Sequence, residues 1–378
     1  MIDFFFTAIL RSNTSLKIFL DGHFLDGQKH GVAIYLEELY LHLMKSRKDI
    51  VLFVGLEEGS SIHSPLFKLD NVHLVGYKFG GWWRFIFDIP LLTRKIAPDF
   101  VHTQNALPVF RGAAKYHVTL FDVLYEDFPS YFGKGYRITR SFFFRMAARK
   151  ASILSTCSEY SARRIPEHYL VAERFNKKII KVIPPGIAPI SDANISELEP
   201  PEFKFLLYVS RFEARKNHLT LIKSFDQALK THPALKLILV GFEIDGSLDT
   251  AIALVCNLKI VDSVIFESNI SSNRLDMLYR SASIVIYPSL CEGFGMPILE
   301  AMLVNPCVMF SDTSAMSDFT FASECFVDPS SSEDMSEKIL DCLSDPMFLH
   351  KNYSFRQKFI RQNYLWSQSG DVLGEIYR

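Results

Sequence analysis

YPSLCEGFGMPILEAM, at residues 287–302, is the stretch that decides the fold of this chain. It completes an apolar run, residues 282–287, of the kind that forms a buried parallel strand. Pro288 and Ser289 then signal a turn, and Pro297 suits the first position of a helix, where its missing N–H would have no partner. The stretch therefore predicts a strand, a glycine-containing loop and a helix, which is the local pattern of an open α/β sheet.

The same stretch predicts a ligand site. Glu292, Gly293 and Gly295 lie in the loop, and Glu300 lies about one turn into the helix. Ligands of open α/β sheets bind where strands end and helices begin, and a helix N-terminus favours an anion. Two carboxylates beside an anion site suggest a ligand with both phosphates and hydroxyl groups, such as a nucleotide-sugar. The alternative is an ordinary tight turn whose glutamates serve the helix dipole.

A second loop, SRFEARKN at residues 210–217, follows the apolar run 205–209. Arg211 and Lys216 flank its turn, and two cations at the carboxyl end of a strand fit a diphosphate. Asn217 is predicted to cap the next helix. A solvated basic loop is the alternative.

Composition limits the class of protein. The 378 residues, 48% of them hydrophobic, are enough for two ordinary domains. The net charge of -1 argues against nucleic acid as a partner. Six scattered cysteines without a C-x-x-C pair indicate thiols in a reducing compartment, not disulfides or a zinc site, and no cofactor is expected. The N-terminal MIDFFFTAIL is too short to span a bilayer, so a cytoplasmic protein is expected.

Short apolar runs alternate with amphipathic stretches along the chain, which predicts parallel sheets with helices on both faces. Strands are expected at residues 17–20, 50–54, 72–75, 100–102, 117–121, 152–156, 179–183, 205–210, 236–240, 263–266, 282–287, 307–310 and 325–327. Helices are expected at residues 32–44, 83–96, 137–150, 160–171, 219–230, 248–258, 274–280, 297–303 and 333–343.

The chain divides at a stretch rich in proline, serine and acidic residues between 183 and 204. We expect an N-terminal domain at residues 1–185, a linker at 186–204, a C-terminal domain at 205–355 and a helical segment at 356–378. The expected architecture is α/β, with two Rossmann-like domains facing a cleft.

SRFEARKN followed by YPSLCEGFGMPILEAM resembles the retaining glycosyltransferases of family four, which have the two-domain GT-B fold. Glu292 and Glu300 match the E-x7-E signature of that family. The first half resembles it less specifically, through GVAIYLEEL at 31–39, VTLFDVLYEDFPSYF at 118–132 and STCSEYSARRI at 155–165.

The resemblance implies a role for each matching residue of the second half. Glu292 would contact hydroxyls of the donor sugar, and Glu300 would contact the ribose. Arg211 and Lys216 would bind the diphosphate.

The resemblance also implies roles for backbone groups and for the first half. Amides of Phe294, Gly295 and Met296 would add donors to the diphosphate. Gly31 would let the first turn approach the phosphates or the acceptor closely, and Asp122 would face the reacting sugar.

Two departures from the family pattern concern the first half. Phe121 stands where the family often has His, so a donor contact of that His would be lost or moved to His117 or His102. Ala33 and Ile34 replace the usual Gly and Arg of the first turn. These changes suggest an unusual acceptor or weak activity.

The resemblance predicts transfer with retention at the anomeric carbon, with a GDP-mannose-like donor and a glycan or lipid-linked acceptor of surface polysaccharide. The chain contains no Asp-x-Asp, and the cationic loop can stabilise the leaving diphosphate, so no metal is expected. The alternatives are a catalytically silent subunit that binds a partner transferase, and a nucleotide-sugar epimerase.

Two segments of the first half combine aromatic and basic residues, YRITRSFFFRMAARK at 136–150 and KFGGWWRFIFDIPLLTRK at 78–95. An interfacial patch on an anionic membrane is one interpretation, which would make the protein peripheral. The other is that the aromatic residues are ordinary core and the basic residues a solvated face.

Overall fold

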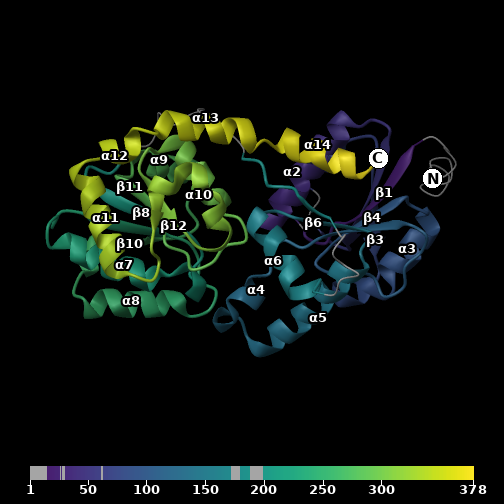
Figure 1. Cartoon of the computed structure of the whole chain (residues 1–378), viewed down its shortest axis with the longest axis horizontal. Helices are drawn as coiled ribbons and strands as arrows, with labels where there is room; N and C mark the ends of the chain where they lie inside the picture. Colours follow the sequence, from purple (N-terminus) through teal and green to yellow (C-terminus); the bar gives the residue numbers. More distant parts are fainter. Residues whose placement is uncertain (1–14, 26, 28–29, 61–62, 172–178, 188–198) are drawn as a thin grey trace. The chain divides into compact units, whose positions relative to one another are not determined.

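The computed structural model describes residues 15–25, 27, 30–60, 63–171, 179–187 and 199–378 (Figure 1). The chain forms two compact units. Unit 1 comprises Met1–Glu126, Phe132–Gly186 and Tyr364–Arg378, and unit 2 comprises Asp127–Tyr131 and Ile187–Asn363.

Unit 1 is built on a parallel sheet that has seven strands among the described residues, in the order β3-β2-β1-β4-β5-β6-β7. The central strands are almost entirely buried, as their near-continuous apolar runs predict. The strands are β1 (Leu16–Asp21), β2 (Ile50–Glu57), β3 (Val72–Tyr77), β4 (Phe100–Gln104), β5 (Lys115–Thr119), β6 (Ile153–Thr156) and β7 (Ile180–Val182).

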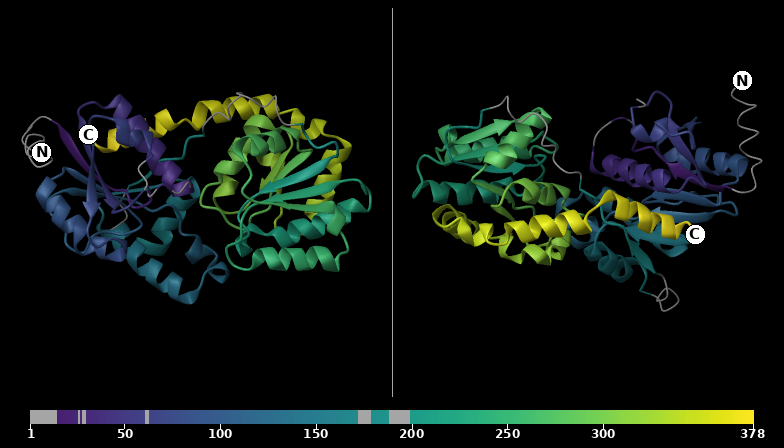
Figure 2. Two further views of the ribbon diagram at one scale, coloured as in Figure 1. Left: turned by 180° about the vertical axis from the view of Figure 1, so that it is seen from behind. Right: turned by 90° about the horizontal axis from the view of Figure 1, so that it is seen from above.

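Helices cover both faces of this sheet, and α2 packs beside the C-terminal helix α14 (Figures 1 and 2). The helices of unit 1 are α2 (Gly31–Ser46), α3 (Asp88–Ile96), α4 (Leu124–Asp127), α5 (Lys134–Lys150), α6 (Glu159–Tyr169) and α14 (Trp366–Ile376).

Unit 2 repeats the architecture with a parallel sheet of six described strands in the order β10-β9-β8-β11-β12-β13. Figure 2 shows these strands with helices on either side. The strands are β8 (Phe205–Val209), β9 (Lys236–Val240), β10 (Val264–Glu267), β11 (Ile284–Tyr287), β12 (Val308–Ser311) and β13 (Phe326–Val327). The helices are α7 (His218–Leu229), α8 (Ser247–Asn257), α9 (Ser272–Ser281), α10 (Met296–Val304), α11 (Ser332–Ser344), α12 (Met347–His350) and α13 (Tyr353–Asn363).

Each predicted strand has a counterpart in the structure, but the helix predicted at residues 83–96 is wrong in its first half. A short 3-10 turn, Gly81–Phe85, precedes α3, which begins only at Asp88. The reason is Pro90, which lacks an N–H and would clash with the preceding turn of a longer helix. The Asp88 carboxylate also accepts hydrogen bonds from the backbone N–H groups of three residues, 78 to 80, and so holds the turn in place.

The C-terminal stretch, expected as one helical segment, consists of two helices in different units. Helix α13 belongs to unit 2 and α14 to unit 1. Tyr377 anchors the second of them, because its hydroxyl bonds to Tyr40 Oη at 2.9 Å and to His117 Nδ1 at 2.9 Å inside unit 1. Most of the expected linker and the N-terminal apolar segment lie outside the described residues. Over the described parts of the chain, the helices are all too short or too polar to cross a bilayer.

Candidate donor site in unit 2

The loop that follows β8 carries the cations expected to hold a diphosphate. After Ser210 the chain makes a 3-10 turn, Ala214–Lys216, and reaches Asn217 in the left-handed conformation, with φ of 63°. Asn217 takes the N-cap position of α7, but its side chain does not cap the helix as predicted. Its Nδ2 instead donates to the carbonyls of Pro288 at 3.0 Å and Pro329 at 2.7 Å. Asn217 therefore ties this loop to the end of the neighbouring strand β11.

The loop that follows β11 ends in a glycine whose backbone conformation would be strained with any other residue. Gly295 has φ of 110°, and a Cβ atom there would lie 3.1 Å from Ile298 Cδ1. Helix α10 begins at Met296, so Pro297 takes its second position, one residue later than predicted. The N-terminal end of α10 therefore opens at the carboxyl edge of the sheet, where its dipole favours an anion.

Hydrogen bonds join the two loops into one site. The Leu290 N–H donates to the Arg215 carbonyl at 2.8 Å, and the Glu292 N–H donates to Ser314 Oγ at 2.8 Å. Tyr208 in β8 donates to the Lys216 carbonyl at 2.8 Å. The Glu292 and Lys216 backbones are thus fixed from several sides, as a preorganised charged site requires.

A chain of alternating charges runs through these loops. Lys216 Nζ lies 2.5 Å from Glu292 Oε1, and Arg215 NH1 lies 3.1 Å from Glu292 Oε2. Arg215 also pairs with Glu213 at 2.9 Å, and Arg211 reaches the same carboxylate at 3.3 Å. Within this chain of contacts, three cations face two carboxylates.

The environment of Glu292 keeps it ionised. Burial raises its pKa, but the Lys216 ammonium and the Arg215 guanidinium outweigh burial and lower the pKa to about 2. Only 17% of the Glu292 side chain and 14% of the Lys216 side chain are exposed. Glu292 is therefore a fixed negative charge that holds Lys216 in one position.

Arg211 differs from the other cations of the loop in its exposure. Its side chain is 46% exposed, against 12% for Arg215, and it pairs with Glu213 only at the rim. Arg211 can therefore turn toward an incoming anion at little cost, whereas Arg215 is committed to two carboxylates.

Glu300 lies in α10 as a half-buried carboxylate. Among the described residues, none pairs with it or donates a hydrogen bond to it. Burial raises the pKa of Glu300 above its ordinary value of 4.5. A half-buried acceptor of this kind is suited to a ligand that supplies hydrogen-bond donors, such as hydroxyl groups.

The two expected site residues of the first half lie in unit 1, at the carboxyl edge of its sheet. Gly31 is the first residue of α2, and His30 caps that helix by accepting from the Ala33 N–H at 3.3 Å. Asp122 follows β5, and its Oδ1 accepts from the Leu124 N–H at 3.2 Å. Both residues lie where a helix follows a strand, although helix α4, which follows Asp122, was not among the predicted helices.

The suggestion that His102 or His117 takes over a donor contact is wrong. Both imidazoles are fully buried and stack on each other, with ring centroids 4.0 Å apart. His102 bonds to Tyr40 and Thr119, and His117 bonds to Tyr377 and Ser155, so all four ring nitrogens are occupied. Burial lowers the pKa of His117 to about 3, which keeps it neutral. The pair is a structural part of the sheet.

Phe121, at the position where the family often has His, is part of the packing at the same edge. Its ring meets the Tyr35 ring edge-on at 5.3 Å, and its carbonyl accepts from Cys157 Sγ at 3.0 Å. An apolar ring at this position offers no hydrogen bond to a ligand.

Sequence reasoning missed two residues of these edges. Arg215 was not singled out beside Arg211 and Lys216, although it makes the link between Glu213 and Glu292. Gly22 follows β1, and a Cβ atom there would lie 2.4 Å from Val54 Cγ1. The Asp-Gly pair at residues 21 and 22 was the available signal for a tight backbone passage at this strand end.

Within the described part of the chain, the His, Cys, Asp and Glu side chains form no group of three or more that could hold a metal ion.

Comparison with known proteins identifies the family. The glycosyl transferases group 1 family matches residues 191–366, and glycosyltransferase family 4 matches residues 30–189. An O-antigen chain mannosyltransferase of Salmonella typhimurium is 33% identical over 119 residues, which cover 30% of this chain and 34% of that protein. The chain spans about a third to a half of the length of this relative and of two other curated relatives that it matches.

Solved structures share the fold over nearly the whole chain. Sucrose-phosphate synthase from Thermosynechococcus elongatus superposes with a TM-score of 0.78 at 19% identity, covering 96% of this chain and 98% of that one. Anabaena HepE in complex with UDP and glucose superposes with a TM-score of 0.70 at 19% identity, covering 96% and 99%. The architecture is therefore the GT-B fold predicted from the sequence.

Proposed function

The chain belongs to the glycosyltransferases of family four, and on that premise we propose that it transfers a sugar from a nucleotide-sugar to a glycan or lipid-linked acceptor, with retention. The observation that carries the proposal is the pairing of a cationic loop with a half-buried carboxylate at one strand edge. Lys216 and Arg211 suit phosphates, and Glu300 suits hydroxyl groups.

The leaving group defines the chemistry that the site must supply. As the sugar departs, negative charge grows on the diphosphate, and fixed positive groups lower the barrier. Lys216, Arg211 and the N-terminal end of α10 would provide that charge without a divalent metal. Backbone amides of Phe294, Gly295 and Met296 would add hydrogen bonds at the same end.

The contact between Glu292 and Lys216 couples the two parts of the donor. A diphosphate that draws on Lys216 competes with Glu292 for the same ammonium. Glu292 would then be released in part to accept bonds from hydroxyls of the donor sugar. Sugar and diphosphate recognition would thus meet in one ion pair.

On unit 1 we assign Asp122 to the reacting sugar and Gly31 to a close backbone approach. Asp122 lies in the loop between β5 and α4, at the carboxyl edge of the sheet, where its Oδ1 accepts from the Leu124 N–H. The acceptor would attack on the face that the diphosphate leaves, which is how retention arises in this family.

We propose GDP-mannose as the donor. The proposed pathway is surface polysaccharide synthesis at the cytoplasmic side of a membrane. The name of the Salmonella relative favours mannose, whereas the structural neighbour HepE holds UDP. A thermal-shift panel of GDP, UDP, GDP-mannose and UDP-glucose separates these donors, because a ligand at a hundredfold over its Kd adds about 2.7 kcal/mol.

Two other functions remain candidates. Phe121 in place of His favours a silent subunit that binds a partner transferase, and such a subunit would bind nucleotide without turnover. A nucleotide-sugar epimerase would convert the donor without releasing nucleoside diphosphate. Release of nucleoside diphosphate by the isolated chain with an acceptor extract supports the transferase, and its absence in the presence of bound donor contradicts it.

A further inference from the structure

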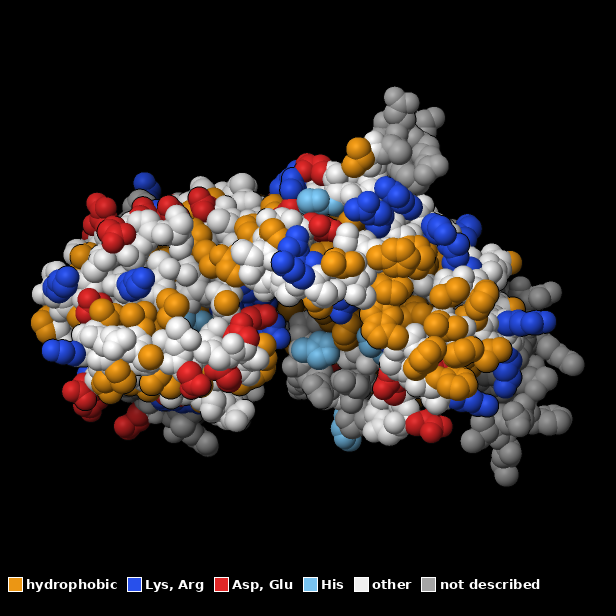
Figure 3. Space-filling model, turned by 90° about the horizontal axis from the view of Figure 1, so that it is seen from below, with side chains coloured by type: hydrophobic (Ala, Val, Ile, Leu, Met, Phe, Trp, Pro, Cys, Tyr) orange, Lys and Arg blue, Asp and Glu red, His pale blue; other side chains and the backbone are white. Residues whose placement is uncertain are grey.

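Unit 1 exposes large apolar side chains to solvent in the segments 78–95 and 136–150. From the sequence, the aromatic residues of these segments could belong either to the core or to a membrane interface. Trp82 is 49% exposed, Trp83 59% and Phe142 64%. Figure 3 shows a broad apolar patch on this unit with Lys and Arg side chains at its edge. We call this surface the aromatic face, and its members are Phe79, Trp82, Trp83, Phe87, Leu91, Phe110, Ile138 and Phe142.

Ring contacts connect the members from different elements. Trp82 stacks on Phe143 of α5 with centroids 4.7 Å apart, and Phe87 contacts both Trp83 at 6.1 Å and Phe79 at 5.1 Å. An apolar surface of this kind is unusual for a protein without a partner.

A buried ion pair holds the aromatic face in place. Arg84, between Trp83 and the core, lies 3.1 Å from Asp21 at the end of β1, and both side chains are almost fully buried. Tyr77 donates to the same carboxylate at 2.9 Å. The two tryptophans that precede Arg84 therefore lie on a turn that is fixed to the core.

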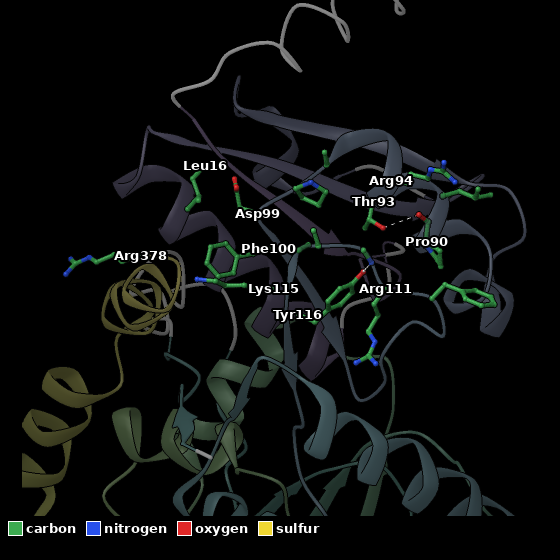
Figure 4. A pocket seen from close by; sticks show the side chains of 17 residues that line it. Leu16, Pro90, Thr93, Arg94, Asp99, Phe100, Arg111, Lys115, Tyr116 and Arg378 are labelled. Carbon is green, nitrogen blue, oxygen red and sulfur yellow. Dashed lines mark hydrogen bonds between the residues drawn. The ribbon is translucent and has the colours of Figure 1, made fainter. Parts of the chain in front are cut away.

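The aromatic face continues into a cavity of about 820 Å³ at the amino ends of β1, β4 and β5 (Figure 4). Leu91 and Phe110 belong to both. Phe87 is the N-cap residue of α3, Leu91 follows four residues later and Arg94 three residues after that, so one side of the helix runs from the rings to the cavity.

Four cationic side chains line the cavity: Arg94, Arg111, Lys115 and Arg378. Figure 4 shows them spread around the rim and not converging on one point. Asp99 is the one acidic side chain of the lining, and its Oδ2 accepts from the Lys17 N–H at 2.8 Å. A spread of cations suits an array of anionic groups better than a single small anion.

The charge of the surrounding segment has the same sign. Residues 78–150 contain twelve Lys and Arg against five Asp and Glu, a surplus of seven, in a chain whose net charge is -1. The positive charge is thus concentrated on the part of unit 1 that carries the aromatic face.

We propose that the aromatic face docks on a bilayer of anionic phospholipid and that the cavity takes the lipid headgroups. Tryptophan and phenylalanine would enter the interface between headgroups and acyl chains, and the cations of the rim would meet the lipid phosphates. The inference rests on the proposed function in one respect, because docking would bring the enzyme to a lipid-linked acceptor. The surface itself does not depend on it.

Tryptophan fluorescence tests the docking directly. Two of the three tryptophans lie on the aromatic face, and the third, Trp366, is 7% exposed. With vesicles of phosphatidylglycerol and bromine-labelled phosphatidylcholine, the full chain should show strong quenching that Trp82→Phe with Trp83→Phe abolishes. Vesicles of phosphatidylcholine alone should quench little. Unchanged fluorescence with anionic vesicles at low salt overturns the proposal.

Sedimentation with the same vesicles separates the rings from the charges. Trp83→Ser with Phe87→Ser and Leu91→Ser should abolish binding. Arg94→Glu with Lys115→Glu should weaken it at least about tenfold, since both changes replace an attraction to the anionic surface by a repulsion. Matched controls on unit 2 are exposed apolar and basic residues that should leave binding unchanged: Ile252→Ser with Val261→Ser and Met347→Ser, and Lys223→Glu with Lys230→Glu.

Two further outcomes decide between occupants. If the wild type forms a dimer in solution that the triple serine variant loses, and does not bind vesicles, the face is a self-association surface and the proposal is wrong. Nucleoside diphosphate binding without vesicles is measured in parallel. If the docking variants still bind nucleoside diphosphate, the aromatic face and the donor site act separately. If the wild type binds vesicles but no nucleotide, the docking proposal stands and the proposed transferase function is wrong.

Discussion

The carboxyl edges of the two sheets share the same arrangement of strands, loops and helices but differ in how many charged side chains they carry. In unit 2, five charged side chains are linked at the ends of β8 and β11, and Glu300 lies in α10, the helix that follows β11. In unit 1, the buried charge at the end of β1 is neutralised by Arg84, and the rest of the edge offers Gly31, Phe121 and Asp122. Fixed charges suit a constant feature such as the diphosphate of a donor, whereas a sparsely charged edge can accept varied partners. The difference supports the proposal that unit 2 recognises the donor and that unit 1 selects the acceptor.

Removal of Glu292 should have the largest effect on the charged edge. Glu292→Ala leaves Lys216 and Arg215 without their shared carboxylate, and breaking such a buried arrangement costs about 3 kcal/mol of the free energy of unfolding. Urea denaturation measures the loss. Glu267→Ala breaks a more exposed pair with Arg274 and should cost about 1 kcal/mol or less. Equal losses would show that the network is not the special feature of this edge.

The same carboxylate predicts a pH dependence. The folded pKa of Glu292 is about 2, below the ordinary 4.5, so its contribution is complete above about pH 4.5 and is lost as pH falls through about 2. The stability difference between the wild type and Glu292→Gln should therefore be constant above pH 4.5 and shrink below it. A difference that instead shrinks as pH rises would contradict the assignment.

Asp122 tests the sparsely charged edge. Asp122→Asn should lower kcat about a hundredfold if the carboxylate acts at the reacting sugar, because acid–base groups contribute about that much or more. Urea denaturation checks that the variant is folded, since asparagine Oδ1 can still accept from Leu124. Asp70→Asn, at an exposed site, is the control. Full activity of Asp122→Asn would remove the proposed role.

Lys216 and Arg211 should contribute to binding of the phosphates and not to binding of the nucleoside. Replacing either by Ala should weaken nucleoside diphosphate binding by about 1.5 to 3 kcal/mol, the range for hydrogen bonds to charged groups, and spare the free nucleoside. Isothermal titration measures both ligands, with Lys223→Ala as the control. Arg211→Ala should leave stability unchanged because its side chain is largely exposed. Equal losses for nucleoside and nucleoside diphosphate would indicate a folding defect.

Glu300 should contribute about 1.5 kcal/mol to binding of the nucleoside, at the lower end of the same range. Glu300→Gln should lose that contribution, and Lys351→Gln should not. Because burial raises the pKa of Glu300, wild-type affinity should begin to fall at a pH above 4.5 as the carboxylate takes up a proton. The Gln variant should lack this fall, and the same pH profile in both would exclude Glu300 as its cause.

The smallest expected effect is that of metal removal. If cations of the loop replace a metal, EDTA should leave turnover unchanged. Activity that EDTA abolishes and magnesium or manganese restores would show that the charged edge is incomplete by itself.

Sequence predicted the fold and the two strand-to-helix loops of unit 2 because their signals are local. Alternating apolar runs place each strand, and Pro288, Gly295 and Pro297 mark a strand-to-helix turn within a few residues. The E-x7-E spacing of Glu292 and Glu300 can likewise be read from the chain alone.

Tertiary structure decided which groups meet. Arg215 and Glu292 are 77 residues apart, and only the adjacency of β8 and β11 brings them together. The same holds for His117 and Tyr377, which are 260 residues apart. Their hydrogen bond shows that His117, considered from the sequence as a donor contact, is a buried structural residue. Sequence also left open whether Trp82 and Trp83 were core or surface, because periodicity does not show which apolar stripe finds a partner. Burial depends on the packing of distant elements, and in unit 1 that packing leaves these two rings exposed.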